Sequence, residues 1–272
     1  MKIGNRDFDT ENNTYIMGIL NVTPDSFSDG GEYNSPDRAL FRVKEMIEQG
    51  ADIIDIGGES TRPGYTPLTE QEETERVLPV IEAVRREFDI PISLDTSKAG
   101  VARAGISAGA DLINDIWGLK QDEDMAKVIA DAGVSCCLMH NRRNDGYRDF
   151  LSDVIADLEQ SLEIAHRAGI SDEKIMVDPG IGFAKSYEQN LWMINNVDRL
   201  HIFGLPVLLA ASRKSVIGNT LSLEKNERVE GTLATSVLAV VKGCSFVRVH
   251  DVKENYRAVR MALAIRNASP EF

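Results

Sequence analysis

The chain has 272 residues, of which 43% are hydrophobic and 27% are charged, a composition typical of one large or two small globular domains and not of a disordered protein. With 30 Lys and Arg against 43 Asp and Glu, the formal charge is -13, so the averaged field repels nucleic acid and anionic lipid, and an anionic ligand needs a local cluster of cations. No apolar run approaches the ~20 residues of a membrane span, and residues 1–7 lack the apolar core of an export signal, so we expect a soluble, cytoplasmic protein.

Eight short apolar runs recur along the chain, and most of them follow a glycine that ends a helical pattern. The runs are residues 15–20, 53–56, 90–94, 112–113, 135–139, 175–177, 207–209 and 246–247. The glycines are Gly50, Gly109, Gly133, Gly169, Gly204 and Gly243. Nearly continuous apolar character is typical of parallel strands that are covered on both faces.

Segments with helical periodicity separate these runs. Ser35 and Pro36 supply a cap and a first-turn proline for one helix, Thr69 and Glu72 form a capping-box pair for the next, and residues 151–165 carry an apolar stripe. Eight strand-helix units fit a (β/α)₈ TIM barrel better than a doubly wound sheet, which usually has fewer strands. No linker or low-complexity tract divides the chain, so we expect a single domain over residues 1–272 with its core at about 15–264.

A polar or ionisable residue stands directly after each apolar run. In chain order these residues are Asn21, Asp55 with Glu59, Asp95, Asn114 with Asp115, His140, Asp178, Lys214 within the Ser-Arg-Lys-Ser motif at 212–215, and Arg248 with His250. In a closed parallel barrel these strand ends meet at one rim, where the active site of this architecture is built. The alternative is that polar residues follow strands only because loops are exposed to solvent. That accounts for one or two of them, but poorly for carboxylates and amides at nearly every strand end.

The rim residues divide into two chemical groups. Asp95, Asn114 and Asp178 offer carboxylate and amide groups that suit the N–H edges of a flat heterocycle. The motif at 212–215, with Arg248 and His250, gathers cations on an acidic chain at the loops that often bind phosphate in this fold, although a solvated basic patch is the alternative. The pattern predicts a heterocycle that carries a phosphate or pyrophosphate.

Two glycine-rich loops, at residues 21–31 and 57–64, follow the first two strands and have the hydroxyls and turn formers of lids that close over a substrate. Neither has the glycine spacing of a Walker or dinucleotide motif. Together with Asp-Pro-Gly-Ile-Gly-Phe at 178–183 and Ser-Arg-Lys-Ser at 212–215, they closely resemble the motifs of the dihydropteroate synthase family, the folate-pathway enzymes that sulfonamides inhibit. The resemblance runs in family order from about residue 15 to 264.

The resemblance implies a transferase that joins 6-hydroxymethyl-7,8-dihydropterin pyrophosphate to 4-aminobenzoate and releases pyrophosphate and 7,8-dihydropteroate. It further implies Mg²⁺, a homodimer, and departure of pyrophosphate to leave a pterin cation that the amine attacks. By matching positions, it assigns the pterin to Asp95, Asn114, Met139, Asp178 and Lys214. It assigns the pyrophosphate to Asn21, Arg62, Arg248 and His250, and the metal to Asn21. It assigns the aminobenzoate to Phe27, Thr61, Pro63, Phe183 and Ser215. It assigns catalytic roles to Asp25, Phe27, Arg62, Asp95 and Lys214.

Two stretches depart from the family pattern. Residues 141–144 read Asn-Arg-Arg-Asn where many members have a stretch with Gly and Pro, which leaves the conformation of that loop open, and two alanines precede Ser212 where Gly is common. Two other functions remain. One is a pterin-binding methyltransferase partner that passes a methyl group from a methylated folate to a corrinoid, which would not need the cationic loops. The other is a non-catalytic pterin-binding protein, which would have no use for lid residues.

Overall fold

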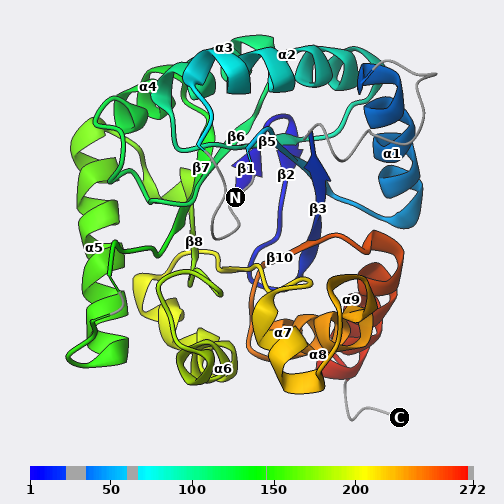
Figure 1. Ribbon diagram of the computed structural model, residues 1–272, viewed down its shortest axis with the longest axis vertical. Coiled ribbons are helices and arrows are strands. Elements are labelled where there is room, and N and C mark those ends of the chain that lie inside the picture. The colour runs from blue at the N-terminus through cyan, green and yellow to red at the C-terminus, as the bar shows by residue number, and fades with distance from the viewer. Residues whose placement is uncertain (23–34, 60–66, 145, 269–272) are drawn as a thin grey trace.

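The computed structural model describes residues 1–22, 35–59, 67–144 and 146–268, and within them eight parallel strands form a barrel surrounded by helices (Figure 1). The strands are β3 (Tyr15–Asn21), β4 (Ile53–Gly57), β5 (Ile92–Asp95), β6 (Leu112–Asp115), β7 (Ser135–Met139), β8 (Ile175–Asp178), β9 (Leu208–Leu209) and β10 (Phe246–Val249). Their order is β8-β7-β6-β5-β4-β3-β10-β9. A parallel bridge between Val177 and Val207 joins the two ends of this order, with Val177 N donating to Pro206 O at 3.0 Å. The predicted (β/α)₈ barrel is confirmed.

The helices lie outside the strands, and their ends follow the signals in the sequence. They are α1 (Ser35–Gln49), α2 (Glu70–Glu87), α3 (Ala99–Ala108), α4 (Met125–Ala132), α5 (Phe150–Ala168), α6 (Tyr187–Asn195), α7 (Ser215–Leu221), α8 (Val229–Val241) and α9 (Val252–Arg266), with short 3₁₀ helices η2 (Asp172–Lys174), η3 (Val197–Phe203) and η4 (Lys225–Glu227). The predicted capping box begins α2, since Glu72 N donates to Thr69 Oγ1 at 3.2 Å and Thr69 N donates to Glu72 Oε2 at 2.8 Å. All six predicted glycine stops have a positive φ.

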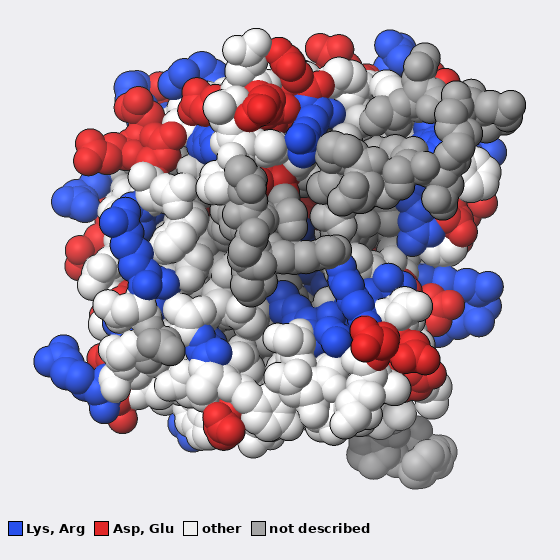
Figure 2. Space-filling view, viewed as in Figure 1, with Lys and Arg blue, Asp and Glu red and all other residues white. Residues whose placement is uncertain are grey.

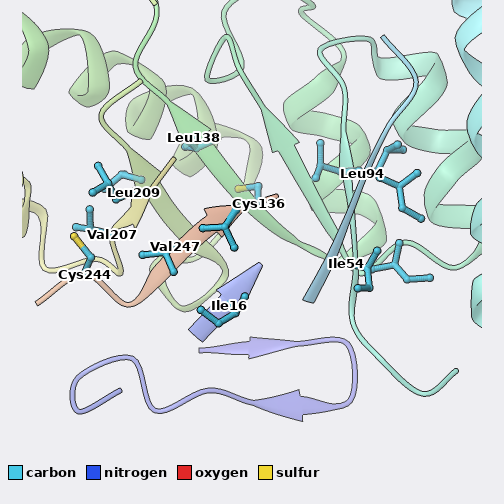
Figure 3. Packing of buried hydrophobic residues seen from close by; sticks show 14 of the residues in the cluster. Ile16, Ile54, Leu94, Cys136, Leu138, Val207, Leu209, Cys244 and Val247 are labelled. Carbon is cyan, nitrogen blue, oxygen red and sulfur yellow. The ribbon is translucent and has the colours of Figure 1, made fainter. Parts of the chain in front are cut away.

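Alternate residues of each strand face opposite sides of the barrel wall. The outward side chains pack against the helices, as Ile54, Leu94 and Leu138 do in Figure 3. The inward side chains form a separate apolar cluster toward the amino ends of the strands, which contains Met17, Ile53, Leu112, Cys137, Met176, Leu208 and Phe246. Ile3 of β1 (Lys2–Ile3), and Phe8 just beyond β2 (Arg6–Asp7), join this cluster. The amino end of the barrel is therefore filled with apolar side chains.

The same alternation determines what faces inward at the carboxyl ends. Two residues beyond Leu112, Met176 and Phe246 lie Asn114, Asp178 and Arg248. Inward positions thus change from apolar at the amino end to polar or charged at the carboxyl end, which is where this architecture builds its sites.

The remaining sequence expectations concern cysteines and membranes. Cys136, Cys137 and Cys244 are buried free thiols, and burial raises the pKa of Cys136, as expected for residues that pack rather than react. No helix within the described ranges is both long and apolar enough to span a bilayer.

Candidate functional site

Arg248 on β10 joins two carboxylates that come from β4 and β5. Its Nε donates to Asp55 Oδ2 and its Nη2 donates to Asp95 Oδ2, each at 2.6 Å. Ser93 Oγ donates to the second oxygen of Asp55 at 2.5 Å. Asp55 is fully buried, and the side chain of Asp95 is only 11% exposed. The inner wall of the barrel mouth therefore holds two carboxylates that share one guanidinium.

One cation cannot neutralise two buried carboxylates, and the pKa values reflect this. Burial raises the pKa of Asp95 to about 7; Arg248 opposes that shift, and the neighbouring Asp55 adds to it. Arg248 itself is held firmly as a cation because both carboxylates raise its pKa beyond the cost of burial. Asp95 is thus a carboxyl group poised to change its charge near neutral pH.

The other residues expected around the pterin end neighbouring strands. Asn114 on β6 pairs in register with Asp95, and Met139 on β7 pairs in register with Asp178 on β8. Asn114, Met139 and Asp178 are all buried. The strands that carry these four residues are consecutive in the sheet, so the structure brings together side chains that are spread over 84 positions of the sequence.

Lys214 reaches the same region from the start of α7. Its Nζ donates to Ile181 O at 2.5 Å and lies 4.9 Å from the centroid of the Phe183 ring. Burial lowers the pKa of Lys214 to about 8, and the charge of Asp178 opposes this. Burial likewise raises the pKa of Asp178, against the effect of Lys214 and of the hydrogen bond from Gly180 N at 2.7 Å. Asp178, Lys214 and Phe183 therefore belong to one cluster.

The cationic group expected at the loops after β9 and β10 is smaller than the sequence suggests. His250 Nδ1 lies 3.0 Å from Ser212 Oγ, so this ring has a fixed orientation next to the loop. Arg213 is instead engaged by Asp251, whose carboxylate accepts from Arg213 Nε at 2.9 Å and also from Nη2. Ser215 is the exposed first residue of α7. Of the expected cations that the structure describes, Lys214, Arg248 and His250 lie at this end of the barrel, and Arg248 is itself bound by Asp55 and Asp95.

Basic side chains gather on the face that looks along the barrel. In Figure 2, blue side chains cluster near the middle of this face, above the position of α7 in Figure 1. The protein as a whole carries a charge of -13, so these side chains are a local concentration of basic groups, although acidic side chains lie directly beside them (Figure 2). An anionic ligand on an acidic protein requires a local concentration of this kind.

Asn21 is the residue that the family resemblance assigns to a metal ion. It ends β3, is half-buried, and pairs in register with Gly57, which in turn pairs with Asp95. No group of three or more His, Cys, Asp and Glu in the described ranges could hold a metal. Mg²⁺ in proteins usually keeps several waters and binds through one or two carboxylates and substrate phosphates, so the amide oxygen of Asn21 could supply at most one ligand beside a bound diphosphate.

Five predicted site residues lie outside the described ranges. They are Asp25 and Phe27 of the first glycine-rich loop and Thr61, Arg62 and Pro63 of the second.

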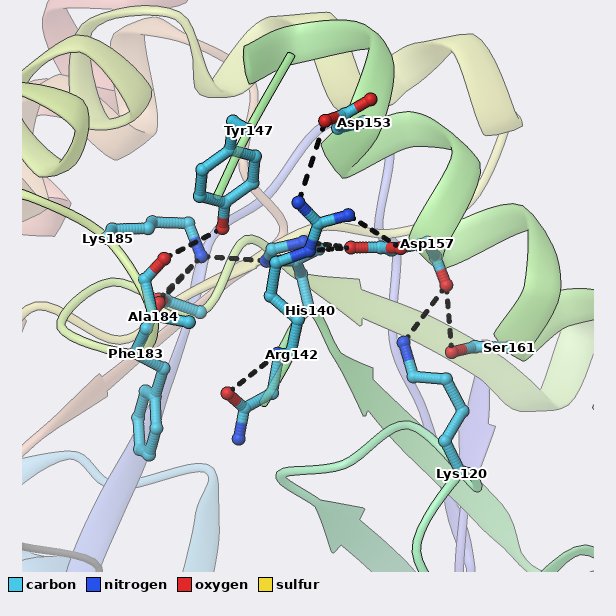
Figure 4. A network of polar contacts seen from close by, with 12 residues as sticks. Lys120, His140, Arg142, Tyr147, Asp153, Asp157, Ser161, Phe183, Ala184 and Lys185 are labelled. Atoms are coloured by element: carbon cyan, nitrogen blue, oxygen red, sulfur yellow. Dashed lines mark hydrogen bonds and ion pairs between the residues drawn. The ribbon is translucent and has the colours of Figure 1, made fainter. Parts of the chain in front are cut away.

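The structure also reveals polar groups that were not among the predicted site residues. Asp55 was recognisable as a strand-end carboxylate, but its pairing with Arg248 depends on a contact between distant strands. His140 was expected at the rim, yet it points outward and contacts Asp157 of α5 and Lys185 (Figure 4). Nothing in the sequence around Lys185 signals that contact.

The loop after β7, whose conformation the sequence left open, is held by Arg142. Its Nε lies 2.9 Å from Asp157 Oδ2, and its guanidinium carbon lies 4.5 Å from the centroid of the Tyr147 ring. Asn141 Oδ1 also accepts from Arg142 N at 2.9 Å. Arg142 of the Asn-Arg-Arg-Asn stretch therefore ties this loop to α5.

Comparisons with known proteins identify related sequences and folds. A family model described as "Pterin binding enzyme" matches residues 17–250. The chain is 58% identical over 262 residues to the dihydropteroate synthase of Clostridium beijerinckii, covering 96% of this chain and 97% of that one. It is 54% identical over 254 residues to that of Bacillus subtilis, covering 93% and 89%.

Solved structures are similar over the whole barrel. A dihydropteroate synthase from Clostridium difficile, crystallised in the presence of pteroic acid, has a TM-score of 0.93 and 49% identity, covering 96% of this chain and 100% of that one. The Yersinia pestis enzyme in a sulfonamide drug complex has a TM-score of 0.92 and 41% identity, covering 98% and 99%. The Xanthomonas albilineans enzyme with 4-aminobenzoic acid has a TM-score of 0.91 and 39% identity, covering 95% of each chain.

Proposed function

The chain belongs to the dihydropteroate synthase family, and we propose that its barrel mouth condenses 6-hydroxymethyl-7,8-dihydropterin pyrophosphate with 4-aminobenzoate to give 7,8-dihydropteroate and pyrophosphate. The observation that carries this assignment is the juxtaposition of carboxylate, amide and cationic groups inside one barrel mouth. Asp95 and Asn114 pair in register on β5 and β6, and Arg248 Nη2 binds Asp95 at 2.6 Å.

The pterin binds between β5 and β8 in this proposal. Asp178 and Asn114 accept the N–H groups of the ring, and Met139 packs against its face. Burial raises the pKa of Asp178, so a hydrogen-bonded N–H partner is worth more there than at a solvated carboxylate. Lys214 lies against the same ligand, in keeping with its position next to Phe183.

Bond cleavage leaves one positive and one negative fragment. The methylene C–O bond breaks with its electron pair going to pyrophosphate, and the pterin becomes a cation that ionised Asp95 stabilises. Arg248 and His250 receive the anion, together with Asn21 and Arg62. The two carboxylates occupy Nε and Nη2 of Arg248, so we assign its Nη1 to the pyrophosphate. Mg²⁺, held through Asn21 when bound, supplies further neutralisation of the leaving anion.

The second substrate then attacks the methylene carbon. A neutral arylamine needs no strong base for this step, and after the C–N bond forms the nitrogen loses one proton to water or to the released pyrophosphate. Phe183 and Ser215 shape its site in this proposal, together with Phe27, Thr61 and Pro63, while Asp25 assists catalysis from the first glycine-rich loop. Phe183 and Ser215 flank Lys214, the first through the contact at 4.9 Å and the second as its neighbour in sequence.

We also propose a cytoplasmic homodimer with one barrel domain per chain. Large apolar side chains are exposed on α8 and α9, among them Val241 at 63%, Met261 at 61% and Ile265 at 65%. Arg266 Nη1 donates to Val240 O at 3.1 Å, so the carboxyl ends of the two helices lie together. An apolar surface of this kind suits a second copy of the chain, and three unbridged cysteines suit a reducing compartment.

A product assay tests the function. Pyrophosphate release from the pterin substrate is expected to require both Mg²⁺ and 4-aminobenzoate, with 7,8-dihydropteroate detected by mass spectrometry. Turnover that occurs only with a methylated folate and a corrinoid protein would instead identify the methyltransferase partner. Pterin binding without any product would identify a non-catalytic protein.

A further inference from the structure

The side chain of Lys185 connects the outer wall of the barrel to the loop that follows β8. Its Nζ lies 2.7 Å from His140 Nδ1 and 3.1 Å from the carbonyl oxygens of both Gly180 and Phe183 (Figure 4). Burial lowers the pKa of Lys185 to about 7, against the charge of Asp178, and in its protonated form the ammonium group has three N–H donors. All three donors of Lys185 are therefore used, one on the β7 end and two on the loop.

The acceptor on the β7 end is itself held in place from α5. His140 Nε2 lies 3.0 Å from Asp157 Oδ2, and Arg142 Nε lies 2.9 Å from the same oxygen. Burial favours a raised pKa for Asp157, but the hydrogen bonds from His140 and Arg142 outweigh it and lower the pKa. An ionised Asp157 accepts from His140 Nε2–H, which leaves the lone pair of Nδ1 for Lys185. Burial lowers the pKa of His140 to about 4, so the ring is neutral in this role.

The loop that Lys185 binds includes residues in the left-handed region of backbone conformation. Gly180 has a φ of 69° and Ala184 a φ of 44°, and the left-handed region is unfavourable for a residue with a Cβ. A Cβ at Gly180 would lie 2.0 Å from the carbonyl oxygen of His140, so the loop also passes close to the end of β7. Tyr147 OH donates to Ala184 O at 2.9 Å. Contacts from outside the loop thus fix it at both ends.

The same loop delivers groups to the site. Ile181 O accepts from Lys214 Nζ at 2.5 Å, the Phe183 ring lies 4.9 Å from that nitrogen, and Gly180 N donates to Asp178 at 2.7 Å. The two carbonyls bound by Lys185, those of Gly180 and Phe183, flank Ile181 in the loop. A displacement of the loop would therefore move the partners of Lys214 and Asp178.

We propose that Lys185, oriented by His140 and Asp157, is a positioning residue that fixes residues 180–184 and thereby orients Lys214 and Phe183 toward the two substrates. The proposal rests on the function proposed above. Lys185 touches no substrate in it, and its effect is transmitted through the loop. Small displacements of such groups are costly, since an error of about 1 Å can reduce a rate by about 100-fold.

The test compares Lys185→Met with a matched control from the same network. Lys120 Nζ donates to Asp157 O at 3.1 Å, so Lys120→Met also removes an amine bound to α5, but one that makes no contact with the loop among the interactions of the described residues. We expect Lys185→Met to lower kcat/KM by about 10- to 100-fold and to speed amide hydrogen exchange in residues 178–186. We expect Lys120→Met to leave kcat/KM within about twofold and the exchange of that segment unchanged.

A double-mutant cycle separates positioning from a general loss of structure. If Lys185 acts through the loop, Lys185→Met costs much less kcat/KM in a Phe183→Ala background than in the wild type, because the two losses overlap. Additive losses, or a Lys185→Met variant with wild-type kcat/KM and wild-type exchange, would overturn the proposal. If Lys185→Met does not fold, Lys185→Gln takes its place in the same measurements.

The activity of the wild type distinguishes failure of the proposed function from failure of the proposed role of Lys185. A wild type that forms no dihydropteroate refutes the proposed function, whatever the variants do. An active wild type with an unaffected Lys185→Met variant refutes only the positioning role.

Discussion

Arg248 and Asp95 are joined through Nη2 and Oδ2 at 2.6 Å, although 153 positions separate them in the sequence. The contact spans the barrel mouth from β10 to β5, with β3 and β4 between them in the sheet. In the proposed reaction these two side chains stabilise fragments of opposite charge. Arg248 binds the departing pyrophosphate, and Asp95 stabilises the pterin cation. Their pairing before substrate binds compensates the charge of Asp95 only in part, because Arg248 also binds Asp55, and the substrate then offers each side chain a partner of opposite charge.

Replacing the carboxylate of Asp95 tests its share in the chemical step. We expect Asp95→Asn to lower kcat by about 100- to 1,000-fold while the KM for the pterin substrate changes much less, because the charge is needed mainly when the cation develops. Steady-state kinetics with both substrates measure the two parameters. A loss confined to KM would show that Asp95 only binds the ring.

The pH dependence of activity reports the same group. Burial raises the pKa of Asp95 to about 7, so its carboxylate forms as the pH rises and kcat/KM should increase between about pH 6 and 8. Lys214 has a pKa lowered to about 8 and Lys185 has one lowered to about 7, so activity should fall again at higher pH as these ammonium groups lose their charge. In Asp95→Asn the rising limb should disappear while the falling limb remains. An unchanged rising limb would assign it to another group.

The contribution of Asp95 to the stability of the fold should decrease as the pH rises, whereas activity increases over the same range. Asp95 has a pKa of 3.8 in its ordinary environment and about 7 in the fold, so between these values the folded state binds more protons than the unfolded state. Stability contributed by this group is therefore present at low pH and is lost as the pH rises toward 7. Thermal unfolding should show a Tm for the wild type, relative to Asp95→Asn, that decreases from pH 5 to pH 8. A difference that grows with pH would mean that Asp95 is stabilised as an anion in the fold.

Lys214 should be needed for turnover but not for folding. It is half-buried, and its Nζ donates to the backbone of the β8 loop at Ile181 O. We expect Lys214→Ala to reduce kcat/KM by at least about 100-fold with little change in Tm. Lys127→Ala is the control, since Lys127 lies on α4 in an exposed pair with Asp131. Near wild-type turnover by Lys214→Ala would show that Lys214 is wrongly assigned to the substrate site.

The sequence predicts the barrel well because its signals are local. Helix-ending glycines such as Gly109, and the capping box at Thr69, depend on neighbouring residues alone, and the structure has both. Strand ends were predicted equally well, because Asp95 and Asp178 close apolar runs and alternation then directs them inward.

Contacts between distant elements could not be predicted in this way. Arg213 was expected among the cations of the site, but Asp251 binds it, and His140 was expected at the rim, but it faces α5. The partners of Lys185 belong to two different strand ends. Each of these depends on how helices and loops pack outside the barrel, which one sequence does not encode in its local spacing.

A crystal structure of this protein with 6-hydroxymethyl-7,8-dihydropterin pyrophosphate and Mg²⁺ tests the central claim most directly. We predict the ring N–H groups within hydrogen-bond distance of Asp178 and Asn114, with Asp95 facing the methylene carbon and the diphosphate against Arg248 and His250. A ring bound away from Asp178 and Asn114, or a diphosphate that touches neither Arg248 nor His250, would contradict the assignment.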